Sequence, residues 1–158
     1  MSPVGATEKT MANSYIQLNV HITFHVKSDA DPIGMDDLPR LFAYLGGCAS
    51  EQGASPIAVG GMPDHIHMLV SLPATVTLSE FVKNIKVWSS KWLKTLSPNY
   101  RGFVWQDGYG AFSVSHSVIP KTVSYIANQA EHHRKMTFRD EYISFLKANE
   151  IAYEEKYL

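Results

Sequence analysis

Hydrophobic side chains follow two different periods along the chain. Apolar and polar positions alternate in stretches rich in β-branched and aromatic residues, which predicts strands, and elsewhere apolar residues recur every three or four positions, which predicts helices. The strand pattern occupies residues 15–27, 55–59, 65–72, 103–105 and 111–116. The helical pattern occupies residues 35–52, 77–96, 120–134 and 138–149. We therefore expect strands and helices to be mixed along the whole chain.

Turn and capping residues mark where several of these elements begin and end. Residues 60–64 (GGMPD) separate two strand patterns, so we expect a hairpin there. Thr77 and Glu80 have the spacing of a capping box, in which two side chains satisfy free amides of the first helical turn. Pro120 has a fixed backbone torsion that suits the first turn of the helix that follows it.

The order of the elements predicts the fold class. Strand, helix, strand, strand, helix, strand is the split βαβ order of the ferredoxin-like fold, an α+β arrangement with two helices on one face of an antiparallel sheet. The remaining C-terminal helices are expected as additions to this core, and because they have no evident internal partner surface they favour a homodimer.

A length of 158 residues with 45% apolar content suits a single domain, which we place at residues 15–158. Residues 1–14 are small and polar without a period and are expected to form a flexible leader.

Composition narrows the functional classes only slightly. The net charge of −1 gives no basic excess, so a nucleic-acid site would have to be a local patch. The sequence has no run of about 18 apolar residues and no secretory signal pattern, and we expect a cytoplasmic protein. The single cysteine, Cys48, lies in an apolar helical stretch and is expected to be a buried structural thiol.

Two histidines on one predicted strand are the first candidate for chemistry. His65 and His67 are two residues apart, so both project from the same face of the strand, while Ile66 points the other way. Two neutral imidazoles can share a divalent ion and leave coordination positions for a third protein ligand. The alternative is a pair of histidines that merely lie on a partly exposed strand face.

The helix predicted over residues 120–134 offers the third ligand and a nucleophile. Tyr125 and Gln129 are four residues apart and share a helix face, and His132 lies near the same line. The Gln129 amide oxygen suits a hard ion such as Mg²⁺ or Mn²⁺. A tyrosine hydroxyl has an ordinary pKa near 10 and needs a nearby cation or base to attack at neutral pH. A solvated polar helix face is the alternative.

Three segments carry a resemblance to a known family. They are DHIHMLVSLP, WQDGYGAFSVS and YIANQAEHH, followed by Phe138 and Glu141. In this order they resemble the single-tyrosine HUH transposases of the insertion-sequence-200/605 type, including the repeat-associated tyrosine transposases. The resemblance implies a ferredoxin-like domain that cuts and rejoins single-stranded DNA, often beside a hairpin, through a covalent 5′-phosphotyrosine.

The same resemblance implies roles for individual residues. It makes Tyr125 the nucleophile and makes His65, His67 and Gln129 the ligands of a Mg²⁺ or Mn²⁺ ion. It further implies a prokaryotic protein that works as a homodimer, in which the tyrosine helix of one subunit can complete the active site of the other. It assigns no role to His132 or His133.

A lysine-rich helix face is the candidate for contact with DNA phosphates. At about 100° per residue, one side of the helix over residues 77–96 gathers Lys83, Lys86, Lys91 and Lys94, opposite the apolar side. A lysine face that is simply solvated is the common alternative. Aromatic residues that can stack on bases, or pack in the core instead, are Trp105, Tyr109 and Phe112.

Two other functions compete with transposition. A HUH nickase that starts replication or plasmid transfer would use the same catalytic groups, but such proteins share with this chain mainly the strand with its two histidines. A ferredoxin-like domain that only binds single-stranded nucleic acid would use its sheet as RNA-recognition domains do. That hypothesis leaves the strand histidines, Tyr125 and Gln129 without a purpose, and metal-dependent cleavage of a labelled oligonucleotide separates the two classes.

Overall fold

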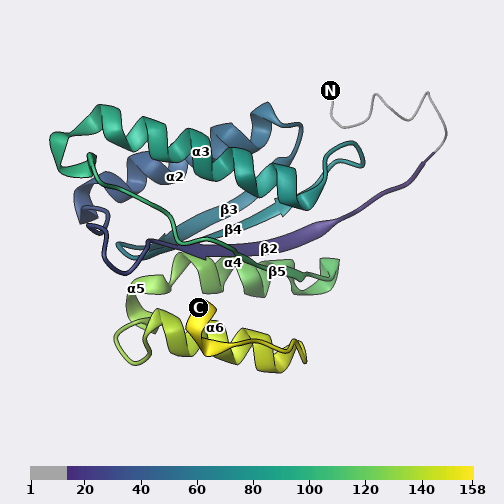
Figure 1. Cartoon of the computed structure of the whole chain (residues 1–158). Helices are drawn as coiled ribbons and strands as arrows, with labels where there is room; N and C mark the ends of the chain where they lie inside the picture. Colours follow the sequence, from purple (N-terminus) through teal and green to yellow (C-terminus); the bar gives the residue numbers. More distant parts are fainter. Residues whose placement is uncertain (1–13) are drawn as a thin grey trace.

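The protein has three layers, with helices on both faces of one sheet. The computed structural model describes residues 14–158, so the expected leader lies, apart from its last residue, outside the described residues. Helices α2 (Leu38–Glu51) and α3 (Leu78–Leu96) lie on one face of the sheet, and α4, α5 and α6 lie on the other (Figure 1). Within the described residues, no helix is both long enough and apolar enough to cross a membrane.

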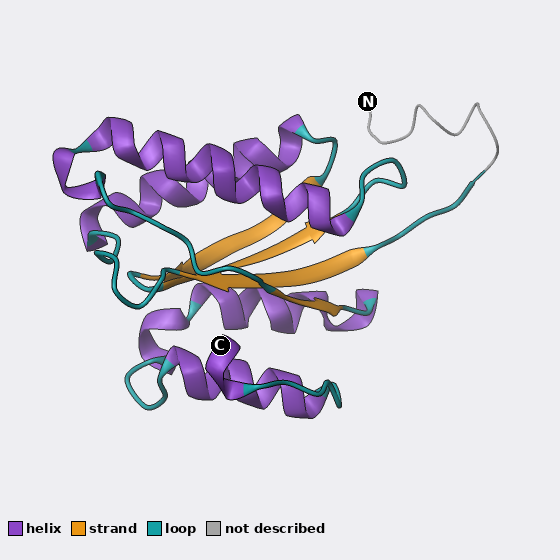
Figure 2. Ribbon diagram, viewed as in Figure 1, coloured by secondary structure: helices purple, strands orange, loops and turns teal. Residues whose placement is uncertain are grey.

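Across residues 14–158 the sheet has four strands, and every neighbouring pair is antiparallel. The strands are β2 (Asn19–His25), β3 (Ser55–Met62), β4 (His65–Ser71) and β5 (Gly110–Ser113), in the spatial order β3-β4-β2-β5 (Figure 2). This order places the first and third of the described strands, β2 and β4, at the centre, as the split βαβ order requires. The ferredoxin-like α+β prediction is confirmed, with the C-terminal helices added on the second face.

The alternation of side chains along the two central strands divides the sheet into two chemically different faces. On β2, Ile22 and Phe24 are buried in the main core under α2 and α3. Ile66 on β4 points to the same side and is fully buried. Because neighbouring residues of a strand point to opposite faces, His21 and the two β4 histidines face the C-terminal helices.

The C-terminal helices pack on that second face through a smaller aromatic cluster. They are α4 (Ile119–Ala127), α5 (Gln129–His132) and α6 (Phe138–Ala148). Phe112 of β5 packs there with Phe138, Tyr142 and Leu146 of α6. The expected absence of an internal partner surface for these helices is therefore wrong, because the sheet itself provides that surface.

Several element boundaries differ from the sequence prediction, among them the following three. Residues 103–105 form no strand, because only Trp105 pairs with the sheet, in an isolated bridge with Val26. The helix expected over residues 120–134 is interrupted at Asn128, whose φ of −102° and ψ of 31° lie outside the helical range. The hairpin is tighter than expected, because β3 continues to Met62 and leaves only two residues in the turn.

Candidate active site

The two strand histidines lie side by side on the face of the sheet that α4, α5 and α6 cover. His65 and His67 are both fully buried, and their ring centroids are 5.1 Å apart. The ring of Phe138 from α6 stacks on His65 with a centroid separation of 4.4 Å. The strand period therefore gives the arrangement that the sequence predicts, and α6 encloses it.

Hydrogen bonds at the Nδ1 atoms orient both histidine rings. His65 Nδ1 lies 2.7 Å from Asp64 Oδ1, and His67 Nδ1 lies 2.8 Å from His21 Nε2. In both rings Nδ1 is thus occupied, and Nε2 points toward the C-terminal helices. Fixing one ring nitrogen so that the other faces a shared point is how proteins orient metal-binding histidines.

The helical break at Asn128 does not separate Tyr125 from Gln129. Gln129 Oε1 lies 2.9 Å from His65 Nε2, and the Gln129 side-chain amide donates to the Tyr125 carbonyl oxygen at 3.2 Å. Tyr125 is partly buried, and its ring centroid lies 5.7 Å from that of His67. All four residues predicted for the metal and the nucleophile are therefore brought together.

Glu141 joins these residues, and its role was not foreseen from the sequence. The side chain is 1% exposed, and its Oε1 accepts from His67 Nε2 at 2.9 Å. Its Oε2 accepts a hydrogen bond from the Tyr125 hydroxyl and lies 3.2 Å from His132 Nε2. Two signals were available: Glu141 is among the residues that carry the family resemblance, and it is a charged residue on the otherwise apolar stripe of α6, between Phe138 and Phe145.

Burial and the Glu141 carboxylate set the protonation of the site. Burial lowers the pKa of His67, so its imidazole is neutral near pH 7, which is the form that binds a metal. Burial alone would raise the pKa of Glu141, but the hydrogen bond from His67, followed by that from Tyr125, lowers it to about 2. Burial and then the Glu141 carboxylate raise the pKa of Tyr125 above its usual value of 10. As the residues stand, Tyr125 is a protonated and weak nucleophile.

The donor set fits a divalent cation. His65, His67, His133 and Glu141 each offer a ligand atom, and these four atoms lie within 4.8 Å of one another. His65 faces an acceptor oxygen at each nitrogen, Asp64 Oδ1 and Gln129 Oε1, whereas a neutral imidazole has one N–H to donate. A cation between His65 Nε2 and Gln129 Oε1 removes that conflict, so imidazole, carboxamide and carboxylate together suit an ion such as Mn²⁺ or Mg²⁺.

Comparison with known proteins identifies the family. The family described as "Transposase IS200 like" matches residues 14–129, which is well over half of the chain. The chain belongs to the IS200-like transposase family. The ISDra2 transposase TnpA of Deinococcus radiodurans is 26% identical over 118 residues, covering 72% of this chain and 84% of the relative.

Solved structures share the fold of this transposase. A crystal structure from Deinococcus radiodurans R1, designated a transposase, has a TM-score of 0.58 at 23% identity and covers 73% of this chain and 93% of that one. The structure of a REP-associated tyrosine transposase bound to a REP hairpin has a TM-score of 0.57 at 15% identity, covering 76% and 71%. Both agree with the ferredoxin-like core described above.

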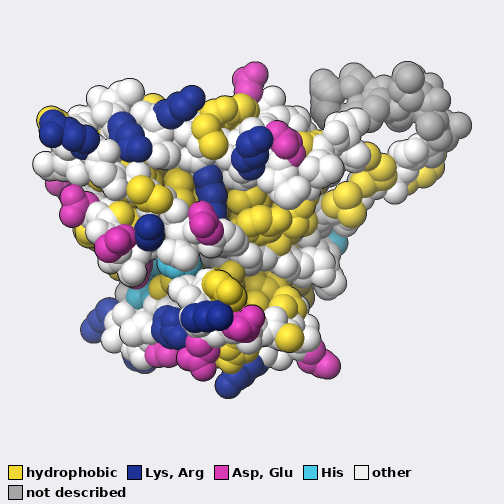
Figure 3. Space-filling view, in the orientation of Figure 1, with side chains coloured by type: hydrophobic (Ala, Val, Ile, Leu, Met, Phe, Trp, Pro, Cys, Tyr) yellow, Lys and Arg dark blue, Asp and Glu magenta, His cyan; other side chains and the backbone are white. Residues whose placement is uncertain are grey.

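The predicted lysine face lies on the far side of the sheet from the transposase's candidate active site. All four lysines are on α3, and the histidines and Tyr125 face the opposite helical layer (Figure 1). Lys86 Nζ donates to the carbonyl oxygens of Gln106 at 2.8 Å and Gly108 at 2.5 Å, so its ammonium group is engaged within the protein. Figure 3 shows the basic side chains of this face scattered among acidic and apolar ones rather than in a continuous patch.

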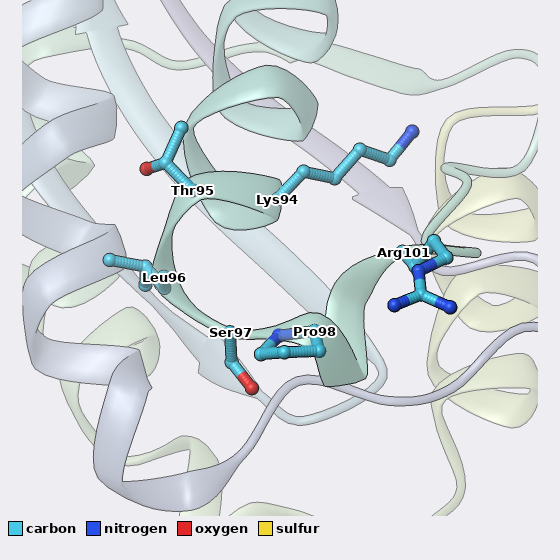
Figure 4. A pocket seen from close by; sticks show the side chains of 6 residues that line it. All are labelled: Lys94, Thr95, Leu96, Ser97, Pro98 and Arg101. Carbon is cyan, nitrogen blue, oxygen red and sulfur yellow. The ribbon is translucent and has the colours of Figure 1, made fainter.

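A shallow pocket at the end of α3 places two cations together. It has a volume of about 390 Å³ and is lined in part by Lys94, Ser97 and Arg101 (Figure 4). It contains none of the residues of the histidine and tyrosine cluster, so it is not where the chemistry is placed. Arg101, which the sequence analysis did not single out, is its second basic residue.

The aromatic residues considered for base stacking are mostly used in packing. Trp105 is 6% exposed, contacts Phe24 edge to face, and donates its indole N–H to Ser89 Oγ at 3.1 Å. Phe112 is also 6% exposed and stacks on Phe145. For these two side chains, core packing is the role that the structure supports.

Proposed function

We propose that this transposase cuts and rejoins single-stranded DNA through a covalent 5′-phosphotyrosine on Tyr125, with a divalent metal ion held by His65, His67 and Gln129. One observation carries the proposal: the Tyr125 hydroxyl and both strand histidines lie next to the same buried carboxylate, that of Glu141. The membership of the IS200-like family supplies the class of reaction. A domain that only bound nucleic acid would gain nothing from burying this set of polar groups, whose desolvation is costly.

The chemistry balances without an energy source. The Tyr125 oxygen bonds to the scissile phosphorus while the bond from phosphorus to the DNA 3′ oxygen breaks. The tyrosine loses its hydroxyl proton and the departing oxygen gains one, so no proton or electron is consumed overall. The phosphotyrosine keeps the energy of the phosphodiester, and a free 3′-OH can attack it to rejoin DNA.

The residues around Tyr125 have two roles in this proposal, to bind the metal ion and to position the tyrosine hydroxyl. When bound, the Mg²⁺ or Mn²⁺ ion polarises the phosphate and stabilises the negative charge on the leaving oxygen. His65 and His67, oriented by Asp64 and His21, and Gln129 hold the ion. Glu141 holds the Tyr125 hydroxyl beside them.

The DNA substrate is proposed from the same comparisons. One structural relative is a REP-associated tyrosine transposase bound to a REP hairpin, and we propose hairpin-flanked single-stranded DNA as the substrate class here. Lys83, Lys91 and Lys94 remain our candidates for phosphate contact, with Arg101 beside Lys94 in the pocket at the end of α3. We also propose that the transposase acts as a homodimer.

The decisive experiment removes one oxygen from the nucleophile. Wild type and Tyr125→Phe are incubated with Mn²⁺ and end-labelled oligonucleotides that carry candidate element ends, and protein–DNA adducts are sought after denaturation. We expect an adduct with wild type and a loss of at least about 1,000-fold with Tyr125→Phe, since residues that act as a catalytic unit lose most of the rate together. Tyr157→Phe changes an exposed tyrosine and should leave the adduct unchanged.

Two results would contradict this proposal. An adduct that persists in Tyr125→Phe would mean that another side chain is the nucleophile. Efficient metal-dependent cutting without an adduct in either protein would mean that water attacks, and the protein would be a nuclease. Circular dichroism of the variant must match that of wild type for either result to count.

A further inference from the structure

Glu141 lies outside the part of the chain that the family comparison covers. The family match ends at residue 129, whereas the carboxylate comes from α6, Phe138–Ala148. We propose that Glu141 is a ligand of the metal ion and that its second oxygen positions Tyr125 beside that ion. This inference rests on the proposed metal site and adds to it a residue and a helix.

The separations between polar atoms are those expected around one ion. Glu141 Oε1 lies 2.9 Å from His67 Nε2, 3.3 Å from His133 Nε2 and 3.7 Å from His65 Nε2. Ligands that are about 2.1 Å from an octahedral ion lie about 3 Å from their neighbours, and tetrahedral ligands lie slightly farther apart. The carboxylate oxygen is therefore at ligand-to-ligand distance from the nitrogens of His67 and His133, and His65 Nε2 lies slightly farther away.

A buried nitrogen beside Glu141 lacks a partner among the described residues. Within residues 14–158, His133 Nε2 has no hydrogen-bond partner, although it is enclosed and lies near Oε1. Leaving such a group unsatisfied is costly. A cation among His65, His67, His133 and Glu141 would satisfy this nitrogen and would also neutralise a carboxylate that is almost completely removed from water.

The two oxygens of Glu141 face different parts of the reaction. Oε1 faces the imidazoles, whereas Oε2 accepts from the Tyr125 hydroxyl and lies near His132. An unneutralised carboxylate next to a phenol opposes loss of the phenol proton, and a cation on its other oxygen offsets that effect. Glu141 thus links occupancy of the metal site to how easily the Tyr125 hydroxyl loses its proton. Helix α6 is then part of the active site.

Metal affinity tests the inference without relying on activity. Mn²⁺ binding to the full chain is measured by calorimetry for wild type, Glu141→Gln, Asp140→Asn and His67→Ala. Glu141→Gln keeps the size of the side chain and removes its charge, and we expect its Mn²⁺ affinity to fall at least 10-fold. Asp140→Asn makes the same change at the adjacent exposed position of α6 and should bind Mn²⁺ as wild type does.

The variants separate failure of this inference from failure of the proposed metal site. If His67→Ala loses Mn²⁺ binding but Glu141→Gln keeps wild-type affinity, Glu141 is not a ligand and the proposed function stands. If His67→Ala also binds Mn²⁺ as tightly as wild type, the metal site itself is wrong. If Glu141 had only a structural role, Glu141→Gln would lower the unfolding temperature in EDTA and leave the Mn²⁺ affinity of the folded protein unchanged.

A crystal of the wild-type protein grown with Mn²⁺ tests the same point if Glu141→Gln does not fold. We expect an anomalous manganese peak about 2–2.5 Å from Glu141 Oε1, the range of metal–oxygen bonds. A peak bonded to the strand histidines and Gln129 with Glu141 well beyond bonding distance would overturn the inference.

Discussion

At the scale of single residues, the site consists of polar groups that are largely removed from water and contact one another. Six of them come from five elements: His21 from β2, the histidine pair from β4, Tyr125 from α4, Gln129 from α5 and Glu141 from α6. Burial is the largest cause of the pKa shifts of His21, His67 and Tyr125. For Glu141, hydrogen bonds outweigh burial and lower the pKa. Such pre-oriented and desolvated groups are typical of active sites.

Burial of histidines predicts how stability depends on pH. Burial, followed by the charge of Lys86, lowers the pKa of His25 to about 4. The unfolded chain binds a proton at an ordinary pKa near 6.5, so between about 6.5 and 4 the unfolded state holds more protons than the folded one. The contribution of His25 to stability is therefore complete above about pH 6.5 and is lost as the pH falls toward 4.

Urea unfolding at several pH values, in EDTA, measures this effect. Wild type should lose unfolding free energy steadily from pH 7 to pH 4, and His25→Phe should show a smaller loss over the same range. His116→Phe changes an exposed histidine and should keep the wild-type slope. Equal slopes in wild type and His25→Phe would show that partial burial does not keep His25 neutral in the folded protein.

At the scale of elements, α4 holds Tyr125 against the sheet through a close backbone approach. A Cβ added to Gly60 of β3 would lie 2.6 Å from the Ile126 carbonyl oxygen and 2.9 Å from Ile126 Cγ2. Real side chains do not tolerate such distances to backbone, so α4 or β3 would have to move. The glycine lets the helix that carries the tyrosine lie directly on the sheet.

Replacing this glycine should therefore displace the tyrosine helix. We expect Gly60→Ala to lower the free energy of unfolding by about 1–3 kcal/mol, the usual range for overpacking, and to reduce adduct formation by Tyr125. Gly47→Ala is the matched control, because nothing lies within 4 Å of the added Cβ in the interior of α2. It should stabilise the protein by about 0.5–1 kcal/mol through helix propensity. Equal stability of Gly60→Ala and wild type in denaturant unfolding would contradict the close approach.

At the scale of the whole molecule, the position of the C-terminal helices determines which apolar surface is left for a partner subunit. They cover the second face of the sheet within the same chain, so they do not need a partner subunit to be buried (Figure 2). Among the large apolar side chains that stay exposed, three lie close together in the segment before β2: Tyr15, Ile16 and Leu18. An exposed apolar segment of this kind is typical of a contact surface.

The proposed homodimer is tested by its mass in solution. Sedimentation of the full chain at micromolar concentration, without DNA, should give a single species of twice the 17.7 kDa chain mass. A twofold interface buries the same residues on both subunits, so Ile16→Glu should shift the equilibrium toward monomer. Wild type that sediments only as monomer would count against the dimer, whatever the behaviour of the variant.

The amino-acid sequence by itself determined the local parts of this protein. The strand period put His65 and His67 on one face, and helical spacing put Tyr125 and Gln129 on another, because these relations extend over only a few residues. The order of elements likewise predicted the ferredoxin-like core. The break at Asn128 was missed, since no proline or glycine marks it.

Only the tertiary structure decided which elements meet. Glu141 reaches the histidines because α6 folds back over the second face of the sheet, 74 residues beyond His67 along the chain. His21 reaches His67 because β2 and β4 pair in one particular register. Contacts between distant segments depend on packing and strand register, which a pattern of neighbouring residues does not specify, and these contacts complete the candidate active site.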